Sequence, residues 1–209
     1  MNSRGTLIVV SGPSGVGKGT IVHQYLCRNT DVALSVSATT RSPRPGEIDG
    51  VHYHFISKEE FEALVSSGGM LEHAKYGSNY YGTLKSAVKD CIDKGQDIIL
   101  EIECQGAMQI KKSCADALFI FVMPPSFAEL HRRLSGRGTE NEEDIKARLH
   151  TAIAEMSAAY EYDYIVFNNE VEDSVQKFES IVKAYKCSSA VMKKYIDEIN
   201  NEAKLSIQD

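Results

Sequence analysis

The 209-residue sequence has no long hydrophobic segment. Its longest uninterrupted apolar run covers residues 117–123, which is far too short to cross a bilayer. The apolar stretch that follows Arg4 is interrupted from Ser11 onward, before it could form the core of a signal peptide. Internal repeats and low-complexity segments are also missing. We therefore expect a soluble protein of the cytoplasm with no membrane partner.

Closely spaced cysteines are absent as well. The five cysteines are never closer than ten residues, which fits neither a disulfide framework nor a CxxC metal or redox motif. The six histidines show no metal-ligand spacing. We therefore expect reduced thiols, and no metal or organic cofactor that the protein holds by itself.

Positive charge is scarce overall, with 23 basic against 29 acidic residues and a formal net charge of −6. This balance excludes a general affinity for nucleic acid. The eight arginines are nevertheless clustered, because six of them fall in two short segments: Arg41 and Arg44, then Arg132, Arg133, Arg137 and Arg148. Clustered guanidinium groups in an acidic protein indicate a small anion bound by forked contacts.

Buried strand-like runs alternate with helix-like segments, which predicts an α/β fold. Near-continuous apolar or β-branched runs are typical of parallel strands buried on both faces. We expect such strands at residues 6–11, 34–38, 97–103, 117–123 and 163–167. Helices are expected at residues 18–28, 84–94, 126–134 and 140–160, and from 171 to about 204 as one long helix or two consecutive ones. The prediction is a parallel five-stranded sheet flanked by helices.

Two segments interrupt this alternation. Residues 41–83 contain a turn rich in proline and glycine at 41–46 and an alternating strand at 52–56, so they look like an insertion with its own small sheet. Residues 126–150 are dense in charge around Gly136 and Gly138, a composition suited to a mobile flap.

One glycine-rich segment follows the first predicted strand directly and opens the first predicted helix. Its glycines allow backbone N–H groups to converge on a phosphate, the helix N-terminus adds positive potential, and Lys18 can neutralise the β- and γ-phosphates. The usual motif has serine or threonine straight after the lysine, whereas here Gly19 intervenes and Thr20 brings the hydroxyl one position later. A glycine-rich turn with an incidental lysine is the alternative. We predict a nucleoside triphosphate site at Gly12, Pro13, Ser14, Gly15, Val16, Gly17, Lys18, Gly19 and Thr20.

Further motifs follow this loop along the chain. They are SATTRSPRPG at residues 37–46, GVHYHF at 50–55, LEHA at 71–74, NYYGT at 79–83, QGA at 105–107 and RLSGRG at 133–138. In the order and spacing of these motifs, from about residue 5 to 186, the sequence closely resembles the guanylate kinases. The resemblance covers most of the chain.

This resemblance implies a phosphotransferase of purine nucleotide metabolism. It implies Mg²⁺-dependent transfer of the γ-phosphoryl group of ATP to GMP, and to dGMP, so ATP, GMP, ADP and GDP are the expected small-molecule partners. It also implies one domain over residues 1–209, with a P-loop core at about 1–36, 84–125 and 150–209, a GMP-binding insertion at about 37–83 and a lid at about 126–149. Assembly into a homo-oligomer stays open.

The resemblance also implies a role for individual residues. Ser37, Glu72 and Thr83 are expected to recognise guanine. The residues expected to bind the GMP phosphate are Arg41, Arg44, Tyr53 and Tyr81. The expected catalytic residues are Lys18, Arg41 and the lid arginines Arg133, Arg137 and Arg148. Asn168 matches a position near the adenine of ATP. Glu101 and Glu103 stand where relatives generally carry aspartates; we place both in the GMP site, and Glu101 with Thr20 at the metal.

The chemistry of guanine agrees with this assignment. Its N1–H and exocyclic amine are adjacent donors, and one carboxylate such as Glu72 can accept from both, whereas adenine presents an acceptor at N1. The acceptor phosphate is already an anion and needs no general base, so the protein must align two polyanions and offset their repulsion with arginines. We expect the insertion and the lid to close on the substrates and exclude water.

Two alternatives remain on sequence grounds. The first is a catalytically inactive protein-interaction module of the same fold. Such modules typically lose the P-loop lysine and the lid arginines, which this sequence retains at Lys18, Arg137 and Arg148. The second is a nucleoside monophosphate kinase with another acceptor, because the Gly-Lys-Gly-Thr end of the loop resembles that of adenylate kinases.

Overall fold

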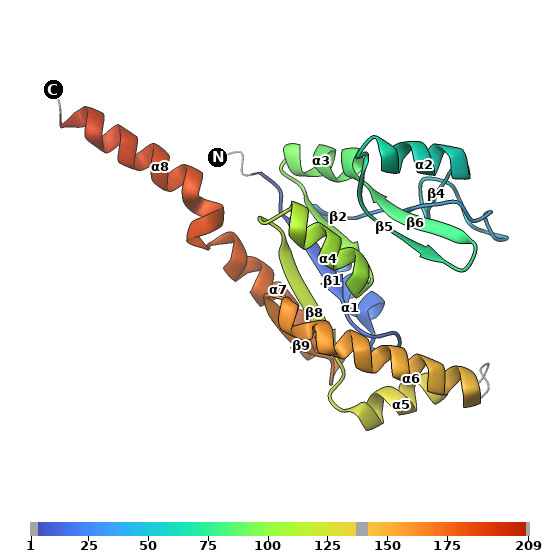
Figure 1. Cartoon of the computed structure of the whole chain (residues 1–209). Coiled ribbons are helices and arrows are strands. Elements are labelled where there is room, and N and C mark those ends of the chain that lie inside the picture. Colours follow the sequence, from blue (N-terminus) through green and yellow to red (C-terminus); the bar gives the residue numbers. More distant parts are fainter. Residues whose placement is uncertain (1–3, 137–141, 208–209) are drawn as a thin grey trace.

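The computed structural model describes residues 4–136 and 142–207 of the chain. Two β-sheets form its framework, a central five-stranded sheet and a smaller four-stranded sheet. Figure 1 shows the smaller sheet and its helix at the upper right of the central sheet, and a helical hairpin at the lower right. None of the described helices is long and apolar enough to span a membrane.

The central sheet is parallel throughout, as buried apolar runs predict. Its strands lie in the order β2 (Val32–Leu34), β7 (Asp97–Glu101), β1 (Leu7–Ser11), β8 (Leu118–Met123) and β9 (Tyr164–Phe167). Leu7 pairs with Ile98 of β7, and Ile8 pairs with Leu118 of β8. All five residues of β1 are buried. The predicted parallel five-stranded sheet is confirmed.

The strand expected at residues 34–38 is wrong. In the central sheet β2 ends at Leu34, after which the Ser35 N–H still donates to the Ile99 carbonyl at 2.8 Å. β3 (Ala38–Thr39) belongs to the other sheet. The alternating pattern of residues 34–38 therefore continues past the point where the chain changes sheets, and periodicity alone does not show such a change.

Alternate residues of the central strands build two hydrophobic cores, one on each face. Ile8 and Val10 pack with α1 (Lys18–Arg28) and α7 (Val171–Lys186), whereas Leu7 and Val9 pack with α3 (Lys85–Asp93) and α4 (Cys104–Ser113). Glu103 is already the N-cap of α4, so β7 ends at Glu101 and not at the expected residue 103. With both faces covered, the loops at the carboxyl ends of the strands are left to form a site.

The smaller sheet has the order β4 (His54–Phe55), β3, β6 (Asn79–Leu84) and β5 (Met70–Tyr76). β5 and β6 form an antiparallel hairpin whose turn contains Gly77 at φ 60°. A capping box of Ser57 and Glu60 starts α2 (Lys58–Ser66), which buries Phe61. Residues 38–84 therefore carry a sheet of their own, as the sequence predicts.

The helical hairpin consists of α5 (Phe127–Ser135) and α6 (Glu142–Ser157), which pack through Leu130, Leu134 and Ala152. The helix expected at residues 140–160 is an α-helix only to Ser157, and one 3₁₀ turn, η1 (Ala158–Glu161), continues it.

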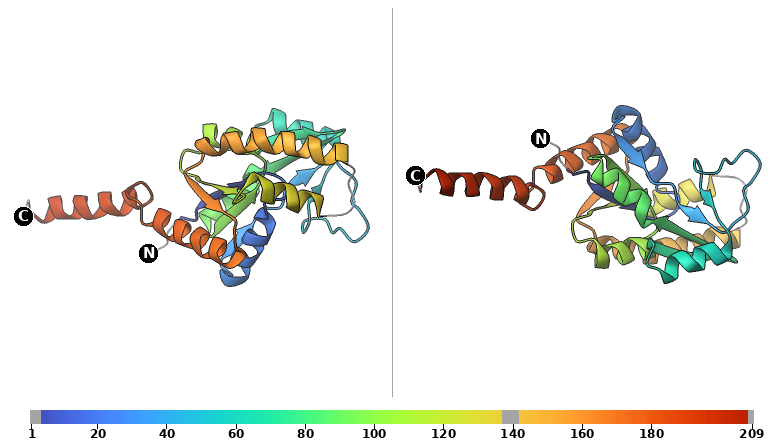
Figure 2. Two further views of the ribbon diagram at one scale, coloured as in Figure 1. Left: turned by 90° about the horizontal axis from the view of Figure 1, so that it is seen from below. Right: turned by 90° about the horizontal axis from the view of Figure 1, so that it is seen from above.

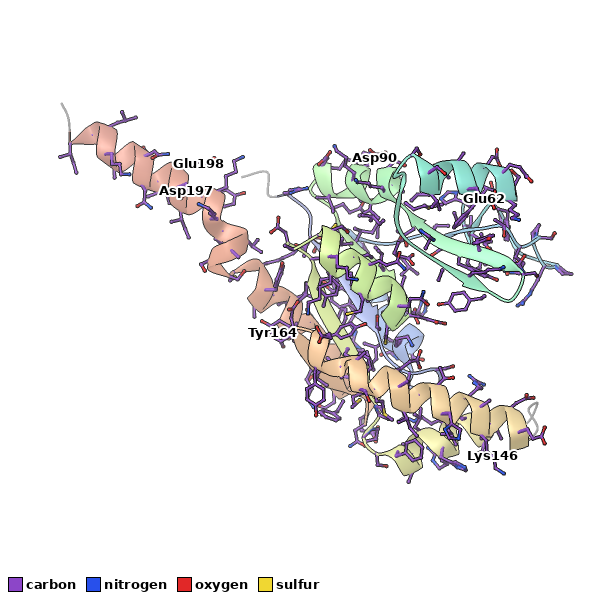
Figure 3. The ribbon with its side chains drawn as sticks, in the orientation of Figure 1. Glu62, Asp90, Lys146, Tyr164, Asp197 and Glu198 are labelled. Carbon is purple, nitrogen blue, oxygen red and sulfur yellow. The ribbon has the colours of Figure 1, made fainter. Side chains whose placement is uncertain are left out.

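The C-terminal helix α8 (Ser189–Ser206) is separate from α7 because the Ser188 hydroxyl caps its N-terminus. None of the residues of α8 is buried. The helix points away from the rest of the molecule in all three views (Figures 1 and 2), and Figure 3 places Asp197 and Glu198 on this projecting part. Of the two predicted forms of the C-terminal stretch, the chain adopts two consecutive helices.

Asp97 connects the start of β7 to two other parts of the core. Its Oδ1 accepts a hydrogen bond from the buried Thr6 N–H at 2.8 Å, and its Oδ2 forms an ion pair with Lys186 of α7. The Asp97 side chain is 4% exposed, whereas that of Lys186 is 42% exposed.

We predict that Asp97→Ala lowers the free energy of unfolding by about 1–3 kcal/mol, because the buried Thr6 N–H loses its acceptor. Asp97→Asn keeps an acceptor oxygen and loses only the pair with the half-exposed Lys186, so we expect a loss below about 1 kcal/mol. Urea denaturation measures both values. Equal losses in the two variants would show that the ion pair, and not the hydrogen bond, carries the stability.

Candidate active site

The glycine-rich loop connects β1 to α1 at the carboxyl edge of the central sheet. Gly17, the residue before α1, has φ 95°, a left-handed conformation that favours glycine. A Cβ atom on Gly12 would lie 2.3 Å from the Val122 carbonyl oxygen of β8. Because these positions carry no side chain, backbone N–H groups near the N-terminus of α1 can approach a phosphate directly.

Lys18 begins α1, and its ammonium group folds back over the loop. Nζ donates to the Gly12 carbonyl at 2.6 Å and to the Pro13 carbonyl at 3.4 Å. Burial lowers the pKa of Lys18, and the carboxylates of Glu101 and Glu155 oppose this shift. A phosphate in the loop would give the ammonium group a charged partner and favour its protonated form.

Glu101 ends β7 beside the loop. A Cβ atom on Gly19 would lie 3.6 Å from both of its carboxylate oxygens. Partial burial raises the pKa of Glu101, and Lys18 opposes this shift. Thr20 is exposed in the first turn of α1. Within residues 4–136 and 142–207 no three His, Cys, Asp or Glu side chains form a metal cluster, so Glu101 and Thr20 could hold a cation only together with ligands from a nucleotide.

Asn168 and Arg133 contact the backbone of the loop. The buried Asn168 Nδ2 donates to the Val16 carbonyl at 2.7 Å, and its Oδ1 accepts from the Ser174 hydroxyl at 3.0 Å. Arg133 of α5 donates to the same Val16 carbonyl at 3.1 Å and to the Asn168 carbonyl at 3.0 Å. Both residues therefore hold the loop in its conformation. Contact of Asn168 with adenine, and of Arg133 with the transferred phosphoryl group, stay predictions.

Two residues of α6 contact Ser14 of the loop. Arg148 Nη2 donates to the Ser14 hydroxyl at 2.6 Å, and the Glu155 carboxylate accepts from the Ser14 backbone N–H. Burial raises the pKa of Glu155. Glu155 was not among the residues predicted from the sequence, although its spacing of seven residues from Arg148 places both on one face of the helix. The third predicted lid arginine, Arg137, lies outside the described residues.

A cavity of 370 Å³ opens between the β5–β6 hairpin and the segment that joins β7 to α4. A second cavity of 160 Å³ adjoins it and shares Ser37, Tyr53 and Glu101 with it. Six of the predicted GMP-site residues line the larger cavity: Ser37, Tyr53, Glu72, Tyr81, Glu101 and Glu103. The structure thus brings most of that set together beside the glycine-rich loop.

Glu72 provides the buried carboxylate of the larger cavity, with 6% exposure. It pairs with Thr83 across the hairpin, and the Thr83 hydroxyl donates to Glu72 Oε1 at 2.7 Å. Burial raises the pKa of Glu72, and the hydrogen bonds from Thr83 oppose this shift. A carboxylate has more acceptor positions than this one hydroxyl uses, so Glu72 can also bind a ligand that presents adjacent donors.

Arg41 forms a bidentate ion pair with Glu47, which was not among the residues predicted from the sequence. Nη1 and Nη2 donate to the two carboxylate oxygens at 2.8 and 2.9 Å. The guanidinium carbon lies 5.2 Å from the ring centroid of Tyr53 and 5.7 Å from that of Phe55. Hydrogen bonds from Arg41 and from the Arg44 N–H lower the pKa of Glu47 to about 2. Arg41 is therefore oriented to bind a flat or tetrahedral anion through its fork.

The remaining predicted residues lie around this pair and the cavity. Arg44 is exposed, and Tyr81 is hydrogen-bonded to Arg41. Glu103 accepts a hydrogen bond from the Tyr76 hydroxyl at 2.5 Å. Tyr76 also lines the cavity, and its ring centroid lies 5.7 Å from that of Tyr81. Tyr76 was not among the residues predicted from the sequence, because it lies in none of the motifs or predicted strands.

We predict that Asn168→Ala weakens ATP binding by about tenfold, because it removes the hydrogen bond that fixes the Val16 carbonyl in the loop. The matched control is Asn169→Ala, which changes the neighbouring exposed amide. Isothermal titration calorimetry with ATP measures the effect. If Asn168→Ala lowered thermal stability and left ATP affinity at the wild-type value, the residue would support the fold and not the loop.

Comparison with known proteins agrees with this arrangement. The guanylate kinase family model matches residues 4–185. The guanylate kinase of Clostridioides difficile is 52% identical over 183 residues, which are 88% of this chain and 89% of that protein. The guanylate kinase of Desulfitobacterium hafniense is 51% identical over 185 residues, 88% of this chain and 92% of that protein. The crystal structure of guanylate kinase from Anaplasma phagocytophilum matches with a TM-score of 0.71 and 34% identity, and covers 90% of this chain and 89% of that one. The chain belongs to the guanylate kinase family.

Proposed function

We propose that the protein transfers the γ-phosphoryl group of ATP to GMP and releases ADP and GDP. One observation carries this proposal: Glu101 lies beside Lys18 of the glycine-rich loop and also lines the cavity that contains Glu72. A triphosphate site and a site suited to guanine therefore adjoin at the end of β7. Membership of the guanylate kinase family supports the same reaction.

Glu72 is the residue that we assign to guanine. Its carboxylate accepts from N1–H and from the exocyclic amine, which lie side by side on the edge of the base. Ser37 lines the same cavity, and Thr83 holds the carboxylate through its hydroxyl. Adenine would bring an acceptor at N1 against the buried carboxylate in place of a donor, which is costly at a buried position.

Arg41 is the principal ligand of the GMP phosphate in this proposal, with Arg44, Tyr53 and Tyr81 around it. The rings of Tyr53 and Phe55 hold the guanidinium in place, and its fork already binds the two oxygens of Glu47. A phosphate presents the same kind of acceptor oxygens. GMP binding therefore exchanges the carboxylate oxygens of Glu47 for phosphate oxygens at an arginine that needs little reorientation.

On the donor side, the backbone of the loop and Lys18 bind the β- and γ-phosphates of ATP. The oxygen donors beside the loop fit Mg²⁺, because this ion is usually held by one or two carboxylates together with substrate phosphates. Thr20 and Glu101 are the residues that would hold it. When bound, the ion would neutralise part of the charge of the phosphates.

The GMP phosphate is an anion and can attack without a general base. The chain has to align the two nucleotides and stabilise charge on the oxygens of the transferred group. Lys18 orients the donor and Arg41 the acceptor, while Arg133, Arg137 and Arg148 supply positive charge from the helical hairpin and its connection. Residues 37–83 and 126–149 close around both substrates and exclude water, which would otherwise accept the phosphoryl group. The cytoplasmic location and self-association stay predictions.

The test is an acceptor screen with ATP and Mg²⁺ against GMP, dGMP, AMP, CMP and UMP. We expect phosphorylation of GMP and dGMP, and a kcat/KM for AMP lower by about 10⁴-fold. Glu72→Ala should lower kcat/KM for GMP by more than about tenfold and leave the low value for AMP unchanged. The control is Glu59→Ala, which changes an exposed carboxylate of α2 and should match the wild type.

Three results would contradict parts of the proposal. GMP binding without turnover would indicate an inactive interaction module. Preference for another nucleotide would contradict GMP as the acceptor. A loss below about tenfold in Glu72→Ala would contradict guanine recognition by this residue.

The raised pKa of Glu72 predicts a pH dependence. Guanine recognition needs the carboxylate, so kcat/KM for GMP should fall as the pH is lowered through a pKa above the ordinary value of 4.5. Below that pKa the fall approaches about tenfold per pH unit. Glu72→Gln cannot lose a proton there, so its profile shows only the titration of other groups, including the GMP phosphate. Identical profiles for the two proteins would contradict the assignment.

A further inference from the structure

One face of α4 lies against the strand that carries Glu72. α4 follows β7 and Glu101 in the chain, so it belongs to the same part of the fold as the glycine-rich loop. β5 is one of the two edge strands of the smaller sheet. Gly106 and Gln109 are three residues apart on α4, a spacing that places both on one side of the helix. Neither residue belongs to the set that we assign to substrate contact.

Gln109 forms a pair of hydrogen bonds with the backbone of His73. Its Oε1 accepts from the His73 N–H at 3.1 Å, and its Nε2 donates to the His73 carbonyl at 2.9 Å. The side-chain amide thus makes the two hydrogen bonds that the backbone of a neighbouring strand would otherwise make with this edge strand. His73 directly follows Glu72, so these bonds fix the backbone on which the Glu72 side chain stands.

The absence of a side chain at Gly106 leaves room for the Glu72 carboxylate. A Cβ atom on Gly106 would lie 2.6 Å from Glu72 Oε2 and 3.1 Å from its Cδ. The carboxylate therefore lies directly against the first turn of α4, where the helix dipole favours a negative charge. Any side chain at residue 106 would push the carboxylate into the cavity.

We propose that Gly106 and Gln109 are positioning residues that set the Glu72 carboxylate at the distance and angle that guanine requires, an inference that rests on the proposed function. Gln109 fixes the backbone beside Glu72, and Gly106 leaves room for its carboxylate. Both belong to α4, which follows β7 and Glu101 in the chain. The base is therefore placed relative to the glycine-rich loop through α4, and not only through the smaller sheet.

The first test is Gln109→Ala. Loss of the two hydrogen bonds to His73 should raise KM for GMP by about tenfold and leave KM for ATP within about twofold of wild type. Inosine monophosphate lacks the exocyclic amine, so a displaced carboxylate should also lower the ratio of kcat/KM for GMP to that for inosine monophosphate by about tenfold. Gln176→Ala, on the exposed side of α7, is the matched control.

The second test is Gly106→Ala, which separates positioning from folding. Alanine favours the helix over glycine by about 1 kcal/mol, and the atom it meets is the end of a flexible side chain, so Tm should stay equal or rise. KM for GMP should nevertheless rise by about tenfold. A residue with only a structural role would not change stability and GMP binding in opposite directions.

The proposal is overturned if both variants keep KM for GMP and the GMP to inosine monophosphate ratio within about twofold of wild type. It is also overturned if KM for ATP and for GMP rise together while Tm falls. The wild-type protein, measured alongside, separates failure of the positioning role from failure of the proposed function, because the proposed function fails if the wild type does not phosphorylate GMP.

If the wild type does not phosphorylate GMP, calorimetry of GMP binding tests the positioning role. An unchanged GMP affinity in both variants, or no GMP binding by the wild type, overturns the positioning role as well.

Discussion

The parallel pairing of β1 with β7 is the constraint on which the whole site depends. In this register Val10 lies beside Glu101, so the loop after β1 and the helix after β7 begin at one edge of the sheet. The side chains of β1 and β7 are buried on both faces, so the two strands form one layer that the flanking helices cover. A hydrophobic requirement of the core thus determines where two polyanions can meet.

Several charged groups of the site are paired with groups of the protein itself. Arg41 binds Glu47, and Lys18 donates to the Gly12 carbonyl. These partners keep partly buried charges from standing alone. Substrate binding is then an exchange of partners. Such an exchange keeps the Arg41 and Lys18 side chains oriented before the nucleotides arrive.

The sequence was sufficient where the signal is local. The glycine-rich loop, α1 and the buried parallel strands follow from glycine spacing and from apolar runs. It was insufficient where distant segments decide the outcome. Gln109 binds the backbone of His73, 36 residues away, and Arg133 contacts the Val16 carbonyl, 117 residues away. Glu47 lies only six residues from Arg41, but an acidic residue in a turn does not by itself indicate an ion pair. The change of sheet after Leu34 was missed for the same reason, because the residue pattern of one strand does not show which strand it pairs with.

The helix α8 lies beyond residue 185, where the family model ends, and it buries nothing. At 1.5 Å per residue its 18 residues extend about 27 Å, comparable with the diameter of a small domain. A single chain of this shape would tumble as an elongated particle, with a hydrodynamic radius larger than that of a sphere of 23.1 kDa. Elution from a sizing column calibrated with round proteins would give too large a mass for a single chain, so light scattering is the appropriate measure of its assembly state.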